Sequence, residues 1–394
     1  MSIASQGEHQ QSIDSHSSGR QRLMGVAEEL LSKHPPSAIS GRRLAREANV
    51  HPTFVGQCFA SLSHLFDEAH AASRNRFLGQ GAEIDPLERS WAVPFALSDH
   101  PQYWRANVHL MLDEVAVDLT HRHPTRLVLQ GLREQHPRMG SARAAALAAA
   151  WWSIQIGALV FERPLRQGFD VSEKVRPAVR RHLDWLLDTL VKGEPPKLRP
   201  SKLPDSRKQL PLPGPAEGRQ GAERALLEAA MTLFRERADV GVSGRELARL
   251  ADVNYGLIHH YFGSKDAVFD QAFVLLHSHY VTDLMGVPPR DRFARLMRHE
   301  SFLRGWAARE LAGLSMPTIE LTGMRALLDG LIVTRQIDRR DRTGLATARG
   351  DAYATIAMGL GWAVCHGTAS KALATDGSAL LSRLLSVKNH ILER

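Results

Sequence analysis

Residues 242–273 read VSGRELARLADVNYGLIHHYFGSKDAVFDQAF, and this stretch decides the fold. Ser243 and Glu246 stand three residues apart, which is the spacing of a capping box at a helix N-terminus. Asn254 and Ser264 are good N-caps for a short second helix and a longer third one. Two short helices joined by a tight turn, the second polar on its outer face, are typical of a helix-turn-helix.

A second copy of this stretch lies 203 residues earlier in the chain. Residues 39–70 read ISGRRLAREANVHPTFVGQCFASLSHLFDEAH, and they align with 242–273 without a gap and with 13 of 32 pairs identical. Between the copies, seven prolines crowd residues 193–221, which predicts an extended spacer. A period of 203 residues is far longer than that of a solenoid repeat, so we interpret the chain as a tandem duplication of a whole domain.

The better-formed copy resembles the DNA-binding segment of the TetR family of bacterial transcriptional regulators. The pattern is a small N-cap, a glycine, an aromatic position, a phenylalanine and a Ser/Asn–Lys pair, which here are Asn254, Gly256, His259, Phe262, Ser264 and Lys265. His259 replaces the tyrosine that is usual in the family. The resemblance implies two all-α units, each with a helix-turn-helix domain and a helical effector-binding and dimerisation domain.

Recognition helices place polar side chains at base edges, while cations and helix N-termini hold phosphates. In the second copy we therefore expect DNA contacts from Arg224, Ser243, Arg245, Asn254, Tyr255, Gly256, His259, His260, Ser264 and Lys265. In the first copy the expected contacts are Ser40, Arg42, Arg43, His51, Thr53 and Gln57.

The first copy departs from the family pattern where the second copy keeps it. Gly56 and Leu62 stand in place of the aromatic residue and the lysine, and Pro52 occupies the first turn of the recognition helix, where proline is tolerated. Two interpretations stay open. This copy reads a different half-site, or it has drifted into a weak phosphate-holding or purely structural role.

Charge adds little to the case for DNA. The chain has 394 residues and a net charge of +8, which is a weak indication of an anionic partner. Residues 219–273 carry seven Lys or Arg against eight Asp or Glu, so the motif and not the charge indicates DNA.

The predicted organisation follows from the repeat and the spacer. It comprises a disordered tail (1–19), a degenerate helix-turn-helix domain (20–79), a helical domain (80–193), a Pro-rich linker (194–221), a well-formed helix-turn-helix domain (222–280) and a second helical domain (281–394). Each helical domain ends in apolar stripes at helical spacing, which suit an intrachain pseudo-dimer, with further homodimerisation left open. The expected interface residues are Trp151, Ile154, Gly157, Leu183, Leu186, Ile356, Gly361, Leu380 and Leu384.

The resemblance also implies a small apolar effector. Its candidate contacts are Trp104, Met111, Trp152, Trp306, Met316 and Met324, although core packing is the more ordinary role of such residues. We expect no metal, because the pairs His121/His123 and His259/His260 do not share a helix face. We expect no cofactor and no enzymatic activity, because the sequence contains no GxSxG, Walker or HExxH motif.

Cysteine usage and hydropathy favour a cytoplasmic protein with no membrane span. The chain has two cysteines, Cys58 and Cys365, and no run of about 18 apolar residues.

The leading hypothesis is a ligand-responsive repressor whose two unequal helix-turn-helix units read a non-palindromic operator. The alternative is a sensor or interaction module that keeps the fold and binds DNA weakly or not at all. The operator, the effector and the number of chains per site stay open.

Overall fold

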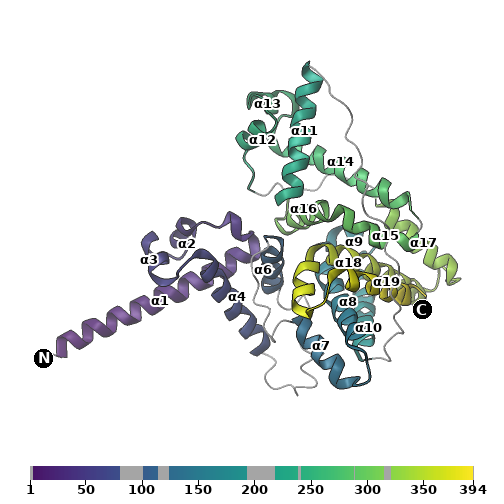
Figure 1. Cartoon of the computed structure of the whole chain (residues 1–394), viewed down its shortest axis with the longest axis horizontal. Helices are drawn as coiled ribbons and strands as arrows, with labels where there is room; N and C mark the ends of the chain where they lie inside the picture. Colours follow the sequence, from purple (N-terminus) through teal and green to yellow (C-terminus); the bar gives the residue numbers. More distant parts are fainter. Residues whose placement is uncertain are drawn as a thin grey trace. The chain divides into compact units, whose positions relative to one another are not determined.

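The computed structural model describes residues 3–79, 101–113, 124–192, 218–237, 241–287, 289–314 and 321–393. Helices are the only regular secondary structure in these ranges, which confirms the predicted all-α class. The chain divides into two compact units, Met1–Asp118 and Leu119–Arg394, and each is described by itself below (Figure 1).

The first unit is a small helical domain built on one long helix. Its elements are α1 (Ile3–Lys33), η1 (Pro36–Ala38), α2 (Gly41–Glu47), α3 (Pro52–Cys58), α4 (Leu62–Gly79) and α6 (Pro101–Leu112). Helix α1 packs against both α4 and α6. The core is formed by Leu23, Ala27, Leu30, Leu31, Ile39, Leu44, Ala45, Ala48, Val55, Phe59, Leu65, Phe66, Ala69, Ala106 and Leu110.

Helix α1 begins at Ile3, whereas the sequence predicts a disordered tail over residues 1–19. Residues 3–22 contain no proline, so no residue there blocks the helix from extending toward the N-terminus from Leu23, which is buried in the core. The structure therefore differs from the prediction in this segment.

The second unit contains the other helix-turn-helix and the helices that follow it. The first four are α11 (Gly218–Arg237), α12 (Gly244–Leu250), α13 (Gly256–Phe262) and α14 (Lys265–Met285). They are followed by α15 (Pro289–Leu296), η2 (Met297–His299), α16 (Glu300–Leu311) and α17 (Thr322–Thr334). Helix α11 takes up the end of the predicted linker, and linker residues 194–217 lie outside the described residues.

Four further helices pack as a bundle in the same unit. Helices α8 (Ser141–Val160) and α10 (Arg176–Lys192) come from the first half of the sequence, and α18 (Arg342–Leu373) and α19 (Gly377–Leu392) come from the second. Helix α8 packs against α18 and α19, and α10 packs against α18 and α8. The shorter helices α7 (Pro124–Gln135) and α9 (Glu162–Gly168) also contact α8.

The crossing of α8 and α18 depends on glycine. A Cβ atom on Gly157 would collide with the carbonyl oxygen of Ala357, and a Cβ on Gly361 would collide with that of Ser153. The two backbones therefore approach more closely than any larger residue permits at these positions.

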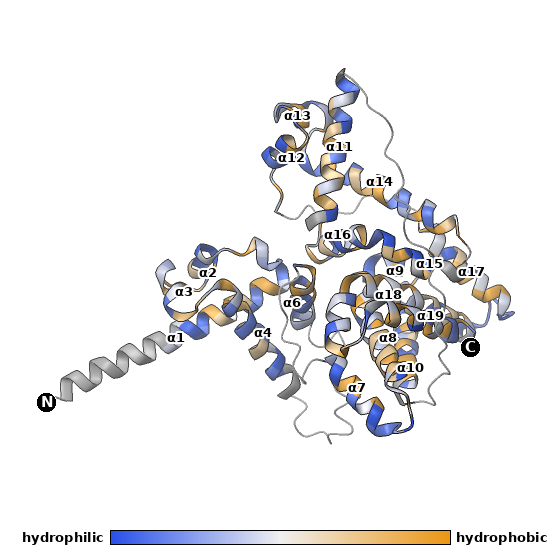
Figure 2. Ribbon diagram, in the orientation of Figure 1, coloured by the Kyte–Doolittle hydropathy of each residue, from blue (hydrophilic) through white to orange (hydrophobic). Residues whose placement is uncertain are grey.

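Helix α8 is the one described helix that is long and apolar enough to cross a membrane, with a mean hydropathy of 1.2. Its residues are mostly white to orange in Figure 2. In the structure 83% of the apolar window is buried, which is the environment of a core helix within a helical bundle.

The division into units differs from the predicted boundaries. The sequence predicts residues 80–193 as one helical domain, but α6 belongs to the first unit and residues 124–192 belong to the second. The cause is where each helix buries its apolar face. Ala106 and Leu110 of α6 join the core of α1 and α4, while α8 and α10 pack on α18.

Candidate functional site

The two helix-turn-helix copies share the same turn geometry. The amide of Val253 donates to the carbonyl of Ala248 at 3.0 Å, and the amide of Val50 donates to that of Ala45 at 2.9 Å. Asp252 and Asn49, at matching positions, both adopt left-handed backbone, with φ of 53° and 50°. Asp and Asn tolerate this conformation better than most residues, so both turns are built by suitable local chemistry.

Both copies also cap their first helix in the same way. The Ser243 hydroxyl accepts a hydrogen bond from the Glu246 amide at 3.2 Å, and the Ser40 hydroxyl accepts one from the Arg43 amide at 3.3 Å. The side chain of Asn254 accepts from the Gly256 amide at 2.8 Å, as expected of an N-cap. Tyr255 already has helical backbone angles, φ −52° and ψ −35°, and the regular helix α13 follows from Gly256.

Helix α13 presents an aromatic and imidazole surface to solvent. Tyr255 is 44% exposed, and its ring lies over Gly244 at the start of α12. His259 is held on both sides, because Nδ1 lies 3.1 Å from the Gly263 carbonyl oxygen and Nε2 lies 3.1 Å from the Tyr255 hydroxyl. His260 is exposed beside the ring of Tyr261, so it is the less constrained of the two imidazoles.

The basic residues predicted to hold phosphate differ in how far they are engaged within the fold. The Lys265 ammonium donates to the Val242 carbonyl at 2.9 Å and thereby ties the start of α14 to the segment before α12. Arg224 forms an ion pair with Glu228 at 2.8 Å. Arg245 is exposed on α12. Their contacts with DNA stay predictions.

The first copy exposes different side chains on its recognition helix. Helix α3 exposes Thr53 and Gln57 and carries no Lys or Arg. His51 caps α3, and its Nδ1 lies 2.8 Å from the Thr53 hydroxyl. Arg43 forms an ion pair with Glu47 at 2.8 Å, while Arg42 is exposed. The DNA contacts predicted for this copy also stay predictions.

The second unit contains a partly open cavity of about 370 Å³ between α14, α15, α16, α17, α18 and α19. Helix α14 reaches this cavity directly from the helix-turn-helix. Its N-terminus carries Lys265, and its C-terminal half lines the cavity with His277, Tyr280, Val281, Leu284 and Met285.

Most of the cavity wall is apolar, with a few polar groups. Thr355 on α18 is buried, and its hydroxyl has no hydrogen-bond partner within the described residues. Lys388 on α19 also lines the cavity and is only 6% exposed. Burial lowers the pKa of His277 to about 4, so this imidazole is neutral at pH 7.

The residues predicted to contact an effector lie in different places, and their role stays a prediction. Trp306 and Met324 line it. Trp104 and Met111 lie on α6 in the first unit, and Trp152 lies on α8, so none of these three lines this cavity. Met316 lies outside the described residues.

The predicted interface residues lie on the four helices of the bundle. Trp151, Ile154 and Gly157 are on α8, Leu183 and Leu186 on α10, Ile356 and Gly361 on α18, and Leu380 and Leu384 on α19. Ile356 also lines the cavity, because the apolar residues of α18 serve both the bundle and the cavity wall.

Sequence reasoning missed Thr355 and Lys388. A signal for Lys388 exists, because it falls at helical spacing among Leu381, Leu384 and Leu385, where a lysine interrupts an apolar stripe. Thr355 stands in an Ala-rich helix, and nothing in the sequence distinguishes it from other small core residues.

The first half of the sequence braces this cavity from outside. The Phe161 ring packs edge-on against Trp306, with centroids 5.4 Å apart. A Cβ on Gly168 would collide with the Met324 side chain. Two residues that line the cavity are thus backed by α9 and the residue before it.

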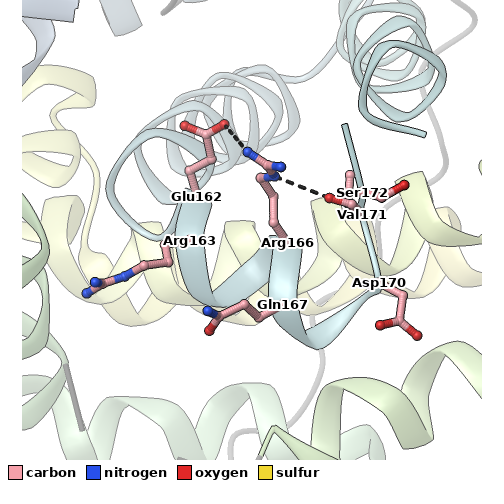
Figure 3. Close-up of a pocket in the computed structure, with 7 residues that line it drawn as sticks. All are labelled: Glu162, Arg163, Arg166, Gln167, Asp170, Val171 and Ser172. Atoms are coloured by element: carbon pink, nitrogen blue, oxygen red, sulfur yellow. Dashed lines mark hydrogen bonds and ion pairs between the residues drawn. The ribbon is translucent and has the colours of Figure 1, made fainter. Parts of the chain in front are cut away.

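A second hollow, of about 580 Å³, lies around α9 and the loop after it (Figure 3). It is lined by Glu162, Arg163, Arg166, Gln167, Asp170, Val171 and Ser172. Its charges pair within the protein. Arg166 donates to the Val171 carbonyl at 3.2 Å, and Arg163 lies 3.0 Å from Glu310. Both arginines of this hollow are therefore engaged by partners within the protein.

Comparison with known proteins assigns the second helix-turn-helix. Residues 226–272 match the family model of bacterial regulatory proteins, tetR family, which confirms the resemblance of this segment. Two relatives are an HTH-type transcriptional regulator, Mb3439c, of Mycobacterium bovis and an HTH-type transcriptional repressor, Rv3405c, of Mycobacterium tuberculosis. Each is 38% identical over 76 residues, which cover 17% of this chain and 40% of the relative. The chain therefore spans less than half the length of these relatives.

Proposed function

We propose that the chain is a sequence-specific transcriptional repressor that responds to a small ligand. The observation that carries this proposal is the tetR-type helix-turn-helix at residues 226–272, which exposes Tyr255 and His260 on its recognition helix. The relative from Mycobacterium tuberculosis is named a repressor, which supports repression in preference to activation. A cytoplasmic location belongs to the same proposal.

We further propose that one chain forms its own pseudo-dimer. Support comes from the bundle in which α8 and α10 of the first half pack on α18 and α19 of the second. Polar contacts also join the halves. His182 Nε2 lies 2.7 Å from the Asp351 carboxylate, and Arg126 Nε donates to the Ala372 carbonyl at 2.7 Å. Because both halves are in one chain, their association does not depend on protein concentration.

The unequal surfaces of the two helix-turn-helix copies favour a non-palindromic operator. Dimeric proteins with this motif place their recognition helices about 34 Å apart, one turn of B-DNA, and identical heads require a palindrome. Here His260 in one head is matched by Gln57 in the other. The two half-sites therefore differ in the proposed operator.

The proposed ligand response acts through α14. This helix carries Lys265 of the reading head at one end and Tyr280 of the cavity wall near the other. A ligand that displaces the cavity end of α14 also displaces the head. It releases DNA only if it binds the non-binding arrangement more tightly.

Binding to DNA from upstream of the chain's own gene tests the proposal. Fluorescence anisotropy at several salt concentrations should give an affinity that falls as salt rises, because phosphate contacts release counterions. Lys265→Ala should weaken binding to all sequences about equally, by roughly 3- to 10-fold, and the matched variant Leu62→Ala should not. Mass measurement of the complex should give one chain per site.

Two results would contradict the proposal. Absence of salt-dependent binding would favour the alternative, a sensor or interaction module with weak or no DNA binding. Two chains per operator would replace the pseudo-dimer with an ordinary homodimer of longer subunits.

A further inference from the structure

We infer that the cavity of the second unit takes a compact, mostly apolar molecule that carries one carboxylate, and that Lys388 and Thr355 hold this carboxylate. The inference rests on the proposed function only in treating the cavity as the effector site. The identity of the ligand's polar group is argued from the cavity itself.

The wall of the cavity selects for an apolar body. Tyr280, Phe293 and Trp306 supply aromatic surface, and leucines from five helices, α14, α15, α17, α18 and α19, supply aliphatic surface. Trp306 packs against Phe161, and Met324 packs against Gly168, on the side away from the cavity. These contacts restrict movement of both side chains. Binding of an apolar ring system to such a wall is favourable because it removes apolar surface from water.

The size of the cavity limits that body. About 370 Å³ lies near the small end of the range for ligand cavities, which is about 300–1,000 Å³. A fused two-ring system with one short polar group suits this space, while a long acyl chain or a molecule of several linked rings does not.

Thr355 indicates where a polar group of the ligand would bind. Its hydroxyl is buried at the cavity and has no hydrogen-bond partner within the described residues. A buried hydroxyl without a partner costs free energy, and a ligand oxygen that accepts its hydrogen bond removes that cost.

Lys388 indicates the charge of that polar group. It lies on α19, which packs against α18, the helix of Thr355. Lys388 has an interaction within the fold, but an ammonium has three N–H donors and can also donate to a ligand oxygen. A carboxylate at this position gains a charge-assisted hydrogen bond in a poorly solvated site.

The remaining titratable groups of the cavity also favour an anion. Arg292 adds a second cation to the lining, and Glu393, the one acid in the lining, is exposed. His277 is neutral at pH 7, and Tyr280 stays protonated because burial raises its pKa. The lining is therefore net positive, and a cationic ligand would be repelled.

Calorimetric titration of the full chain with three probes tests the inference. The probes share one naphthalene body and differ in the polar group: 2-naphthoate, 2-naphthalenemethanol and 2-naphthylmethylamine. We expect 2-naphthoate to bind at least 10-fold more tightly than the alcohol, and the amine to bind most weakly.

Variants assign the preference to the two side chains. Lys388→Gln should weaken 2-naphthoate at least 10-fold and the alcohol less than 3-fold, while Lys388→Arg should retain the preference for the carboxylate. Thr355→Val, which keeps the volume of the side chain, should weaken both the acid and the alcohol. Lys371→Gln, at an exposed lysine on α18, is the control and should change nothing.

The outcomes separate this inference from the proposed function when DNA binding is measured in parallel. If the chain binds its operator but does not bind 2-naphthoate, or binds the alcohol or amine as tightly, the inference is overturned and the repressor proposal stands. If 2-naphthoate binds in a Lys388-dependent way but DNA does not bind, the inference stands and the repressor proposal fails. Unchanged 2-naphthoate affinity in folded Lys388→Gln also overturns the inference.

Discussion

The two helix-turn-helix copies have the same backbone and different surfaces. In both, a valine amide closes the turn, and a left-handed Asn or Asp precedes that valine. On the recognition helices, Gly256 and His260 of one copy stand where the other has Thr53 and Gln57. At the start of the next helix, Lys265 is matched by Leu62.

The comparison distinguishes two kinds of position in the matching segments: those that the fold requires and those that face solvent. Positions that build the head, such as Leu44 and Leu247 at 0% exposure, are the same residue in both copies. Outward-facing positions on the two recognition helices differ, as His260 and Gln57 do. Because folding requires only the first set, the first copy keeps its structure whether or not it reads DNA.

The largest expected effect comes from emptying the core of each head. Leu247→Ala and Leu44→Ala should each lower the free energy of unfolding by about 2–5 kcal/mol, because both leave a cavity at a fully buried site. Operator affinity should fall at least 100-fold for Leu247→Ala and less than 10-fold for Leu44→Ala. Thermal unfolding and anisotropy titration measure the two quantities.

Leu250→Ala is the matched control for this pair. Leu250 lies on the same helix as Leu247 but is 45% exposed, so its loss should change stability by less than about 0.5 kcal/mol. Equal losses of operator affinity in Leu247→Ala and Leu44→Ala would show that both heads contribute equally to binding.

A smaller effect is expected at the matched surface pair His260 and Gln57. His260→Ala should cost about 1–3 kcal/mol of discrimination at one base position, because this exposed imidazole lies on the recognition helix of the better-formed head. Gln57→Ala should change affinity less than about 3-fold. Selection of preferred sites from a random DNA pool measures base preference for each variant. Any altered base preference in Gln57→Ala should fall in the other half-site, as the proposed non-palindromic operator requires.

The heads could be predicted from the sequence because their signals are local. The caps at Ser40 and Ser243 and the apolar positions lie within a few residues of the helices that they define. The cavity could not, because six helices meet there and its polar residues, Thr355 and Lys388, become neighbours of the cavity only through that packing. The extension of α1 to Ile3 was not predicted either. A polar composition indicates that a segment is exposed to solvent, but it does not indicate whether a neighbouring helix continues through that segment.

The smallest expected effect tests the shared backbone directly. Ser243→Ala and Ser40→Ala should each destabilise their own head by about 1 kcal/mol, because each removes one N-cap hydrogen bond of nearly equal length, 3.2 and 3.3 Å. Ser→Asn at either position should restore most of the loss, since Asn also accepts a bond from a helix N-terminal amide.

Hydrogen exchange of the amides in α2 and α12 resolves the two heads within one chain. The expected result is a similar loss of protection in each head for its own variant and no change in the other head. If Ser40→Ala leaves α2 fully protected while Ser243→Ala exposes α12, the two backbones are stabilised differently. The two copies would then differ in the stability of their helices as well as in their exposed side chains.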